Sequence, residues 1–278
     1  MYVNIYYNGI TIGGLIMKGL LFYFSGTGNT KWIADKIQNK LNELGNIIHK
    51  INIENIDEDI LNKINNYDFI IIGTPIYAEM GPKLIQDFVK NIPKAKEKIK
   101  CILYSTQGGN TGCETENMNK ILSNKGYDVV IKVNIKMINN YYFSVGKKPS
   151  KFQIENILTD AEKKVDLIVN KFLKGERYLE NISKTRLCFG KVAAKGFNKL
   201  LPKLSNNFKV TEHCIKCGMC VRNCPKGNIV FENGGVVFHS NCILCLRCIY
   251  MCPSNAIFYK EKRIDQIEKN IIKLLDIK

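Results

Sequence analysis

One cysteine spacing occurs twice in this chain and constrains its structure more than any other feature. The segment CIKCGMCVRNCP begins at Cys214, and CILCLRCIYMCP begins at Cys242, 28 residues later. Both follow the pattern C-x2-C-x2-C-x3-C-P, and together they contain eight of the eleven cysteines. Because no signal peptide is evident, we expect a cytoplasmic protein whose clustered cysteines bind metal rather than form disulfides.

The spacing favours iron–sulfur clusters over other metal sites. Three cysteines at two-residue spacings present three thiolates to one face of a cubane cluster, and the fourth, followed by proline, cannot easily reach that cluster. Beyond each proline, Ile229 and Ile257 begin predicted short strands, and FENGGVVF (231–238) predicts a hairpin. A pair of tetrahedral zinc sites is the alternative, because C-x2-C also suits zinc.

Residues 210–260 resemble the bacterial ferredoxins that bind two [4Fe-4S] clusters. The resemblance implies that one cluster is held by Cys214, Cys217, Cys220 and Cys252. It implies that the second cluster is held by Cys242, Cys245, Cys248 and Cys224.

The first two thirds of the chain alternate apolar strands with amphipathic helices. Strands are predicted at 20–24, 47–53, 67–73, 100–105 and 128–135, and helices at 30–44, 81–92, 114–126 and 152–173. Continuous apolar strands between helices indicate a parallel sheet covered on both faces. We therefore predict an α/β domain with a doubly wound parallel five-stranded sheet.

Three loops of this domain predict a ligand site. SGTGNT (25–30) follows a strand and opens a helix, the setting in which backbone N–H groups bind a phosphate. It lacks the lysine of a nucleoside triphosphate loop and the G-x-G-x-x-G of a dinucleotide site. GTPIYAEMGP (73–82) and STQGGNTGCE (105–114) follow the third and fourth strands, beside the switch point where doubly wound sheets bind ligands.

With these loops, residues 19–173 resemble a flavodoxin, which implies a flavodoxin-like fold and bound FMN. The resemblance implies that the phosphate is bound by Ser25, Gly26, Thr27, Gly28, Asn29 and Thr30. It implies that the ring is flanked by Thr74, Pro75, Tyr77, Thr106, Gln107, Gly108, Gly109 and Asn110. Tyr77 would stack on the ring, although the second loop lacks the tryptophan of simple flavodoxins.

We divide the chain into an N-terminal extension (1–16), a flavodoxin-like domain (17–175), a basic linker (176–208), an α+β ferredoxin domain (209–262) and a C-terminal helix (263–278). The extension fits no element, and Met17 is a candidate start codon. Residues 174–209 hold nine basic residues and two acids. We expect this segment to be partly helical, with Pro202 interrupting a long helix.

The formal net charge of +16 bears on partners. Two clusters and an FMN phosphate would lower it to roughly +10. This charge favours acidic redox proteins as partners and allows the basic linker to contact an anionic membrane peripherally, although solvated lysines explain most of it. No nucleic-acid module and no transmembrane segment is recognisable, so we expect neither DNA or RNA binding nor membrane spanning.

The order of the two domains resembles the flavodoxin–ferredoxin fusion proteins of anaerobic bacteria and archaea. The resemblance implies intramolecular electron transfer between two [4Fe-4S] clusters and FMN in low-potential metabolism. The alternatives are an FMN-dependent reductase of a small substrate, with Glu79 and Glu114 as the nearest acid or base candidates, and a redox-sensing interaction protein. Because no nicotinamide motif is recognisable, we favour the carrier and predict no catalytic residue.

Overall fold

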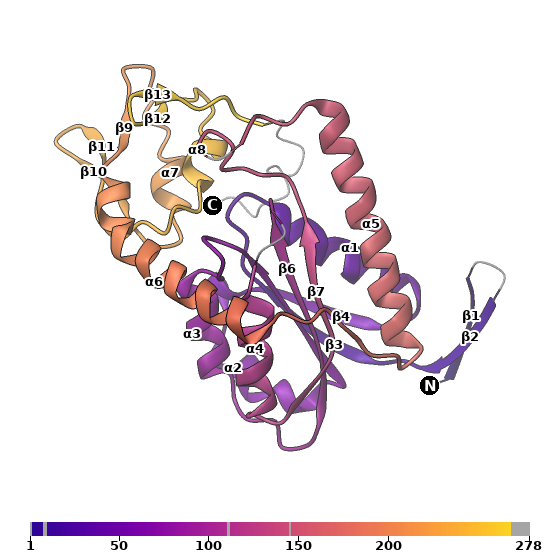
Figure 1. Cartoon of the computed structure of the whole chain (residues 1–278). Helices are drawn as coiled ribbons and strands as arrows, with labels where there is room; N and C mark the ends of the chain where they lie inside the picture. The colour runs from indigo at the N-terminus through magenta and orange to yellow at the C-terminus, as the bar shows by residue number, and fades with distance from the viewer. Residues whose placement is uncertain (1, 8–9, 110–111, 145, 268–278) are drawn as a thin grey trace.

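The computed structural model describes residues 2–7, 10–109, 112–144 and 146–267 (Figure 1). Six parallel strands form its main sheet: β3 (Lys18–Tyr23), β4 (Ile47–Asn52), β5 (Phe69–Pro75), β6 (Ile99–Gln107), β7 (Tyr127–Lys136) and β8 (Tyr178–Leu179). Their order across the sheet is β4-β3-β5-β6-β7-β8, so the winding reverses between β3 and β5. The predicted doubly wound, flavodoxin-like fold is confirmed.

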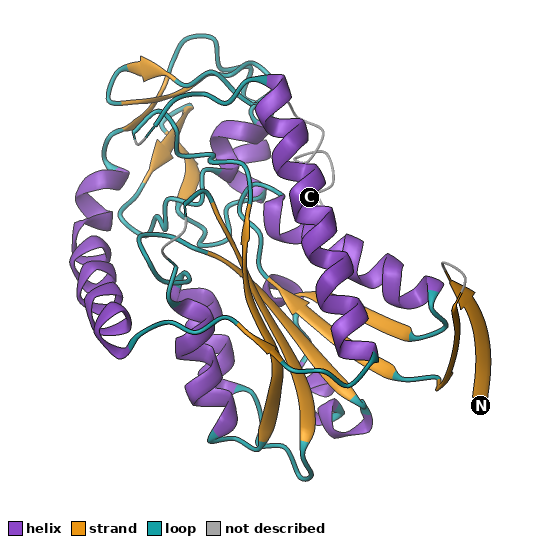
Figure 2. Cartoon of the chain, turned by 45° about the vertical axis from the view of Figure 1, so that its right-hand side comes forward, coloured by secondary structure: helices purple, strands orange, loops and turns teal. Residues whose placement is uncertain are grey.

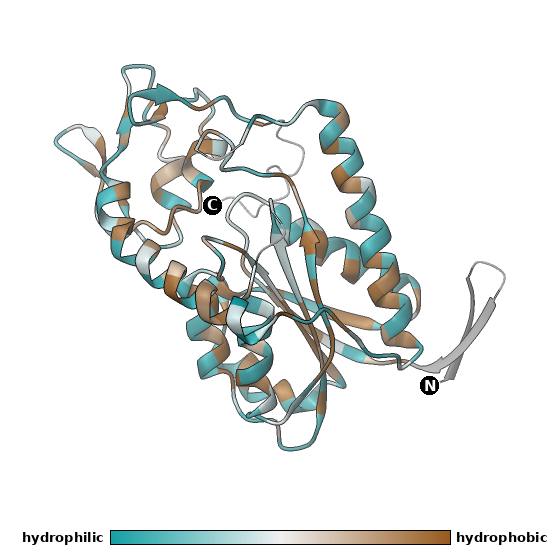
Figure 3. Cartoon of the chain, viewed as in Figure 1, coloured by the Kyte–Doolittle hydropathy of each residue, from teal (hydrophilic) through white to brown (hydrophobic). Residues whose placement is uncertain are grey.

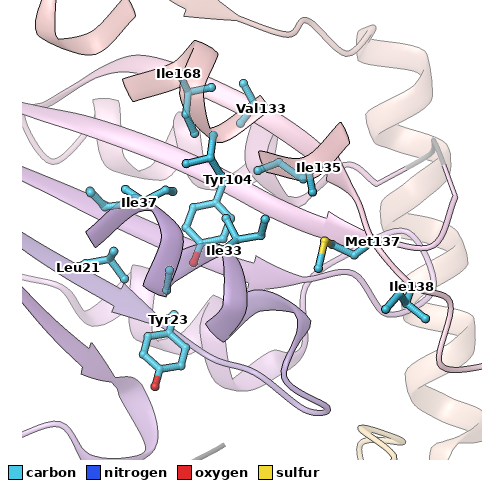
Figure 4. Packing of buried hydrophobic residues seen from close by; sticks show 14 of the residues in the cluster. Leu21, Tyr23, Ile33, Ile37, Tyr104, Val133, Ile135, Met137, Ile138 and Ile168 are labelled. Atoms are coloured by element: carbon cyan, nitrogen blue, oxygen red, sulfur yellow. The ribbon is translucent and has the colours of Figure 1, made fainter. Parts of the chain in front are cut away.

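Helices cover both faces of this sheet (Figure 2). The helices are α1 (Asn29–Glu43), α2 (Glu58–Asn62), α3 (Lys83–Asn91), α4 (Glu114–Ser123) and α5 (Lys151–Leu173), with short 3-10 turns at Ile53–Asn55 and Ile64–Asn66. Residues of α1 and α5 pack on one face, and residues of α3 and α4 pack on the other. Figure 4 shows Ile33 and Ile37 of α1 close to Leu21 and Tyr104 of the sheet. The strands are hydrophobic along much of their length (Figure 3), as burial on both faces requires.

Outside the cysteine-rich region, two short strand regions were not predicted. The sequence predicted five strands, but β8 adds a sixth by pairing in parallel with Ile131 and Lys132 of β7. Two residues are too few to carry a detectable periodic pattern. The prediction that residues 1–16 fit no element was also wrong, because β1 (Tyr2–Tyr7) and β2 (Ile10–Leu15) pair in antiparallel fashion. β1 is rich in tyrosine with one valine and one isoleucine, and β2 contains two isoleucines and a threonine, all residues that favour strands.

The basic segment contains one long helix, α6 (Lys184–Ser205), which begins where the Ser183 hydroxyl accepts a hydrogen bond from the Arg186 N–H (3.2 Å). Pro202 was expected to interrupt a long helix, but it lies inside the last turns of α6. The carbonyl that loses its partner belongs to Asn198, which is exposed, so water can satisfy it. Figure 1 shows α6 running from beside α4 to the cysteine-rich region.

The cysteine-rich region is a small α+β unit at the carboxyl edge of the main sheet (Figure 1). Its elements are β9 (Phe208–Val210), α7 (Met219–Arg222), β10 (Ile229–Glu232), β11 (Gly235–Phe238), α8 (Arg247–Met251), β12 (Ile257–Tyr259) and β13 (Lys262–Arg263). The predicted hairpin is confirmed by the antiparallel β10–β11 pair. The predicted terminal helix is wrong at its start, because residues 264–267 have an irregular backbone. Ile264 and Ile267 are buried, and their packing fixes the course of this segment. The rest of the predicted helix lies outside the described residues.

Candidate redox site

A pocket of about 340 Å³ lies at the carboxyl edge of the main sheet, within the size range of small-molecule sites. Loops after β3, β5, β6 and β7 supply most of its lining. The predicted residues that line it are Ser25, Gly26, Thr27, Asn29, Thr30, Pro75, Tyr77, Thr106, Gln107 and Gly108. Gly28, Thr74 and Gly109 are adjacent to these in the chain but outside the lining, and Asn110 lies outside the described residues.

The predicted phosphate loop is fixed by hydrogen bonds that leave hydroxyl protons available. Gly28 caps α1 with a φ of 101°, a left-handed conformation that favours glycine. The Ser25 hydroxyl accepts from the Gly28 N–H (3.1 Å), and the Thr27 hydroxyl accepts from the Asn140 amide. Each therefore retains its own proton for donation, next to the first N–H groups of α1, which an α-helix leaves without an intrahelical partner.

Two residues of β6 support this loop from the sheet. The Thr30 hydroxyl is hydrogen-bonded to the Thr106 hydroxyl at 2.8 Å. The Tyr104 hydroxyl donates to the Thr30 carbonyl oxygen at 3.0 Å. The strand that carries the third predicted loop therefore also orients the first.

Tyr77 lies where the phosphate loop meets the second cysteine segment. Its hydroxyl is buried and has no hydrogen-bond partner in the described part of the chain. Burial raises the pKa of this hydroxyl well above its ordinary value, and the neighbouring Cys245 thiol adds to the rise. A Cβ atom at Gly26 would lie 2.4 Å from the Tyr77 hydroxyl oxygen and 2.7 Å from the Cys245 carbonyl oxygen. Glycine at position 26 therefore permits these segments to meet.

The two glycines of the third loop lie in different surroundings. A Cβ atom at Gly108 would lie 2.8 Å from the Asn139 Cβ atom, whereas one at Gly109 would meet no atom within 4 Å. The Gln107 side-chain oxygen accepts a hydrogen bond from the Gly112 N–H at 3.1 Å. The close approach to the loop after β7 therefore depends on Gly108 and not on Gly109.

The eight repeated cysteines surround two cavities, four to each. One cavity is lined by Cys214, Cys217, Cys220 and Cys252. The other is lined by Cys224, Cys242, Cys245 and Cys248. We refer to these as the first and second cysteine sets; they are the sets that the ferredoxin resemblance implied.

The thiols within a set influence one another electrostatically. Burial raises the pKa of Cys220 to about 11, and the other thiols of the first set add to the rise. Burial is also the largest cause that raises the pKa of Cys248, and the charges of the other thiols of the second set raise it further. Cys220 of the first set adds a smaller rise, so the two sets are neighbours. Among the described residues, no three His, Cys, Asp or Glu side chains are close enough to hold a single metal ion. Thiols spread around a cavity fit a cubane better than the tetrahedral zinc alternative.

Arg247, in the second cysteine segment, fastens that segment to the phosphate loop. Its guanidinium donates to the carbonyl oxygens of Ser25 (2.7 Å) and Gly26 (3.2 Å). It also makes a two-pronged ion pair with Glu54 at 2.6 and 2.8 Å, and donates to the Asn223 carbonyl oxygen (3.0 Å). Both charged side chains are largely buried, so the pair holds the two regions together in a low-dielectric setting.

Comparison with protein families locates two domains in the chain. Residues 20–137 match a flavodoxin domain, and residues 213–256 match a 4Fe-4S dicluster domain. The chain joins a flavodoxin domain to a 4Fe-4S dicluster domain. Both are electron-transfer domains, so this fusion has an electron-transfer role.

Solved flavodoxins are similar to part of this fusion. A flavodoxin of Fusobacterium nucleatum bound to flavin mononucleotide is 17% identical, covers 58% of this chain and 100% of its own, and has a TM-score of 0.42. A flavodoxin from the domain Archaea is 17% identical over 54% of this chain and 99% of its own, with a TM-score of 0.39. Flavodoxin 1 of Bacillus cereus is 21% identical over 54% and 97%, with a TM-score of 0.37. A comparison with curated proteins found no match.

Several lining residues of the fusion were not predicted. Asn139, Asn140 and Tyr141 line the pocket from the loop after β7, and the position of that loop at a fifth strand end was the available signal. Leu244 and Leu246 from the second cysteine segment and Phe197 from α6 also line it. Their participation depends on how the two domains pack, for which the sequence carries no periodic signal.

The two acids considered for a reductase lie outside the lining that the structure describes. Glu79 forms an ion pair with Arg186 of α6. Glu114 is fully buried, and burial raises the pKa of its carboxyl to about 7, although hydrogen bonds from Asn117, Gly81 and Gln86 lower it.

Within the described residues, no helix is both long enough and apolar enough to span a membrane.

Proposed function

We propose that this fusion is an intramolecular electron carrier that passes electrons between two [4Fe-4S] clusters and one FMN. One observation carries the proposal: Cys245 lines both the cavity of the second cysteine set and the pocket beside the phosphate loop. A group held by that set and a group held in the pocket would therefore be neighbours. Fixing them in one chain replaces a diffusional encounter with a high effective concentration.

The donors of the pocket support FMN as its ligand. Ser25 and Thr27 would donate their remaining hydroxyl protons to the phosphate, beside the N–H groups that begin α1. Tyr77 would contact the ring, and Gln107 and Gly108 would lie along its polar edge. When bound, FMN can accept two electrons and release them singly.

The two cysteine sets support two clusters at different depths. Cys217 and Ile215 are exposed, so the first set lies at the surface. Leu244 and Leu246 flank Cys245 and are buried at the pocket, so the second set faces the flavin site. We therefore propose that electrons pass between the surface, the first set, the second set and the flavin, in either direction.

A substrate-specific reductase is less well supported. Glu79 and Glu114, the acids nearest in sequence, are engaged in other contacts and are outside the described lining. The test is anaerobic turnover with a panel of small acceptors and with redox proteins. A carrier exchanges electrons with several redox proteins, whereas saturation by one small substrate would support the reductase.

For the partner, we propose an acidic redox protein that docks on α6. Six basic residues and no acids lie in Lys184–Ser205. On the outer side of this helix, Phe189, Val192 and Leu200 are 62%, 67% and 53% exposed. Because Phe197 of the same helix lines the pocket, a partner bound there would be close to the flavin. This proximity favours a redox protein over an anionic membrane.

Charge reversal tests this docking surface. The variant Lys195→Glu/Lys199→Glu is compared with Lys94→Glu/Lys96→Glu, a pair of exposed lysines outside α6. The probe is an acidic [2Fe-2S] ferredoxin, and the measurement is the second-order rate constant of electron exchange at low salt. We expect about a tenfold loss for the α6 variant alone. Equal rates in all proteins, or a selective loss of binding to phosphatidylserine vesicles instead, would overturn the proposal.

Two further proposals concern the domains and the location. The flavodoxin-like domain was predicted to end at residue 175, but β8 supports an end after Glu180, whose carboxylate accepts from the Asn134 N–H (2.8 Å). We keep 209–262 as the ferredoxin domain and 1–16 as an extension.

Because eight cysteines form two thiol sets without a disulfide, we propose a reducing, cytoplasmic location.

The first experiment measures iron, sulfide, zinc and FMN in anaerobically purified protein, with EPR after dithionite reduction. The proposal predicts about eight irons (two clusters of four), one FMN and interacting cluster signals. Iron without FMN would favour an interaction protein with a flavodoxin-shaped scaffold. Zinc in place of iron would contradict the redox account.

A further inference from the structure

The two cysteine sets differ at one position that the repeat makes equivalent. Four residues after the last cysteine of each copy, the chain has Asn228 in the first copy and Ala256 in the second. The backbone is alike at both positions: the Asn228 N–H donates to the Cys224 sulfur, and the Ala256 N–H donates to the Cys252 sulfur, both at 3.3 Å. Only Asn228 adds a polar side chain, and it lines the cavity of the second set.

The orientation of the Asn228 amide follows from its neighbour. Its side-chain oxygen Oδ1 accepts from the Asn241 backbone N–H at 2.6 Å. A backbone N–H can only donate, so this contact identifies the oxygen and leaves Nδ2 as the other atom. Nδ2 is buried and has no hydrogen-bond partner within the described residues. Because Asn228 is only 1% exposed, bulk water cannot easily reach this donor.

A buried amide donor without an acceptor is unfavourable, and it calls for a partner. In the second cavity, the acceptors that cluster assembly would add are sulfurs. Ala256, which lines the first cavity, has no side-chain donor, and the polar side chain near it is Ser254, whose hydroxyl lies 3.7 Å from the Cys252 sulfur. The unpaired atom of the neighbouring Asn255 is an oxygen, which cannot donate to sulfur.

We propose that Asn228 Nδ2 donates a hydrogen bond to a sulfur of the cluster held by the second cysteine set and raises the reduction potential of that cluster. The inference rests on the proposed two-cluster carrier. The donor stabilises the reduced cluster more than the oxidised one, because the reduced cluster carries the additional negative charge. Asn228 thus favours an electron on the cluster beside the flavin pocket.

The test is an EPR-monitored redox titration of the anaerobic holoprotein and of Asn228→Ala, which creates the side chain of the other copy. We expect one of two cluster potentials to shift downward and the other to stay unchanged. The matched control is Asn241→Ala, which keeps the backbone N–H that orients Asn228. An unchanged or raised potential in Asn228→Ala would overturn the inference.

A second measurement does not depend on the folding of a variant. Because the Asn228 backbone N–H already donates to the Cys224 sulfur, reduced wild-type protein carrying asparagine labelled with 15N only at the side-chain amide is examined by pulsed EPR for a 15N coupling to a cluster. A coupling supports the hydrogen bond, and its absence overturns it. Loss of both clusters from the wild-type protein, shown by iron analysis, would instead refute the two-cluster proposal itself.

Discussion

The two copies of the cysteine repeat share a spacing but lie in different environments. In the first copy, Cys217 is exposed and Ile215 is 65% exposed. In the second copy, Leu244 and Leu246 are each 4% exposed and line the pocket at the phosphate loop. The repeated positions therefore define where thiols lie, and the positions that differ define which set faces the flavodoxin domain.

The backbone supports this division. Lys216 and Leu244 occupy equivalent positions with φ values of 52° and 53°. Gly218 and Leu246 are also equivalent, with φ values of 74° and 62°. Leucine is strained by about 1–2 kcal/mol in this left-handed conformation, where glycine is not. Burial of a leucine side chain contributes about 1.5–3 kcal/mol, enough to offset that strain at the junction.

Arg247 gives the largest expected effect. Its equivalent in the first copy is Met219, so Arg247→Ala and Met219→Ala form a matched pair. Arg247→Ala leaves Glu54 and two loop carbonyl oxygens without their partner, and breaking such a buried pair costs about 3–5 kcal/mol. We expect FMN affinity, measured by fluorescence titration, to fall at least about tenfold in Arg247→Ala only. Equal losses in both variants would break the comparison between the copies.

Glu114 tests whether the region near α6, rather than the second copy, controls the pocket. Its folded pKa of about 7 exceeds the ordinary 4.5, so the protonated carboxyl stabilises the fold fully below pH 4.5. That contribution is lost as the pH rises to about 7, by up to about 3 kcal/mol. We expect thermal unfolding of Glu114→Gln to lack this pH dependence between pH 4.5 and 8.

The same Glu114→Gln variant should bind FMN as the wild-type protein does. If the stability of both proteins changed with pH in the same way, the raised pKa of Glu114 would be contradicted. Weakened FMN binding would show that the α6 side contributes to the pocket as much as the second copy.

Gly26 tests the close approach between the domains. In Gly26→Ala the new Cβ atom would overlap the Cys245 carbonyl oxygen, and such overpacking costs about 1–3 kcal/mol. We expect FMN affinity to fall about tenfold. Gly109→Ala is the control, because its Cβ atom meets nothing within 4 Å. Unchanged FMN binding in Gly26→Ala would mean that the second copy does not need to touch the phosphate loop.

The smallest effect compares one side chain in both copies. Ile215 and Ile243 are equivalent, but Ile243 is partly buried against the core of the flavodoxin domain. In anaerobic urea unfolding, we expect Ile243→Ala to cost about 1–2 kcal/mol and Ile215→Ala to stay within about 0.5 kcal/mol. Similar losses of unfolding free energy in the two variants would show that the two isoleucines do not differ in burial.

Local patterns predicted the parts of the site that lie within one domain. Strand and helix periodicity, with SGTGNT after the first strand, predicted that residues 25–30 and Tyr77 meet at one site, and all of them except Gly28 line the pocket. The repeated spacing indicated the two cysteine sets that surround the cavities. These features are local because backbone geometry ties such residues to strand ends and short loops.

The junction was not predictable for a physical reason. Arg247 acts on Ser25 and Glu54, which are about 200 residues away in the chain, and no sequence period connects them. The departure from the repeat, arginine in place of Met219, was the visible signal. Pro202 and β8 were mispredicted for a similar reason. Exposure of the helix allowed Pro202 to lie inside α6, and pairing with β7 made β8 a strand.

The most direct test of the account is the rate at which the flavin is reduced after rapid reduction of the clusters. Stopped-flow absorbance is recorded at several concentrations of the anaerobic holoprotein, with the reductant limiting. If the second cysteine set faces the flavin pocket within one chain, the rate constant is independent of protein concentration. A rate that rises in proportion to concentration would show transfer between molecules and would contradict the account.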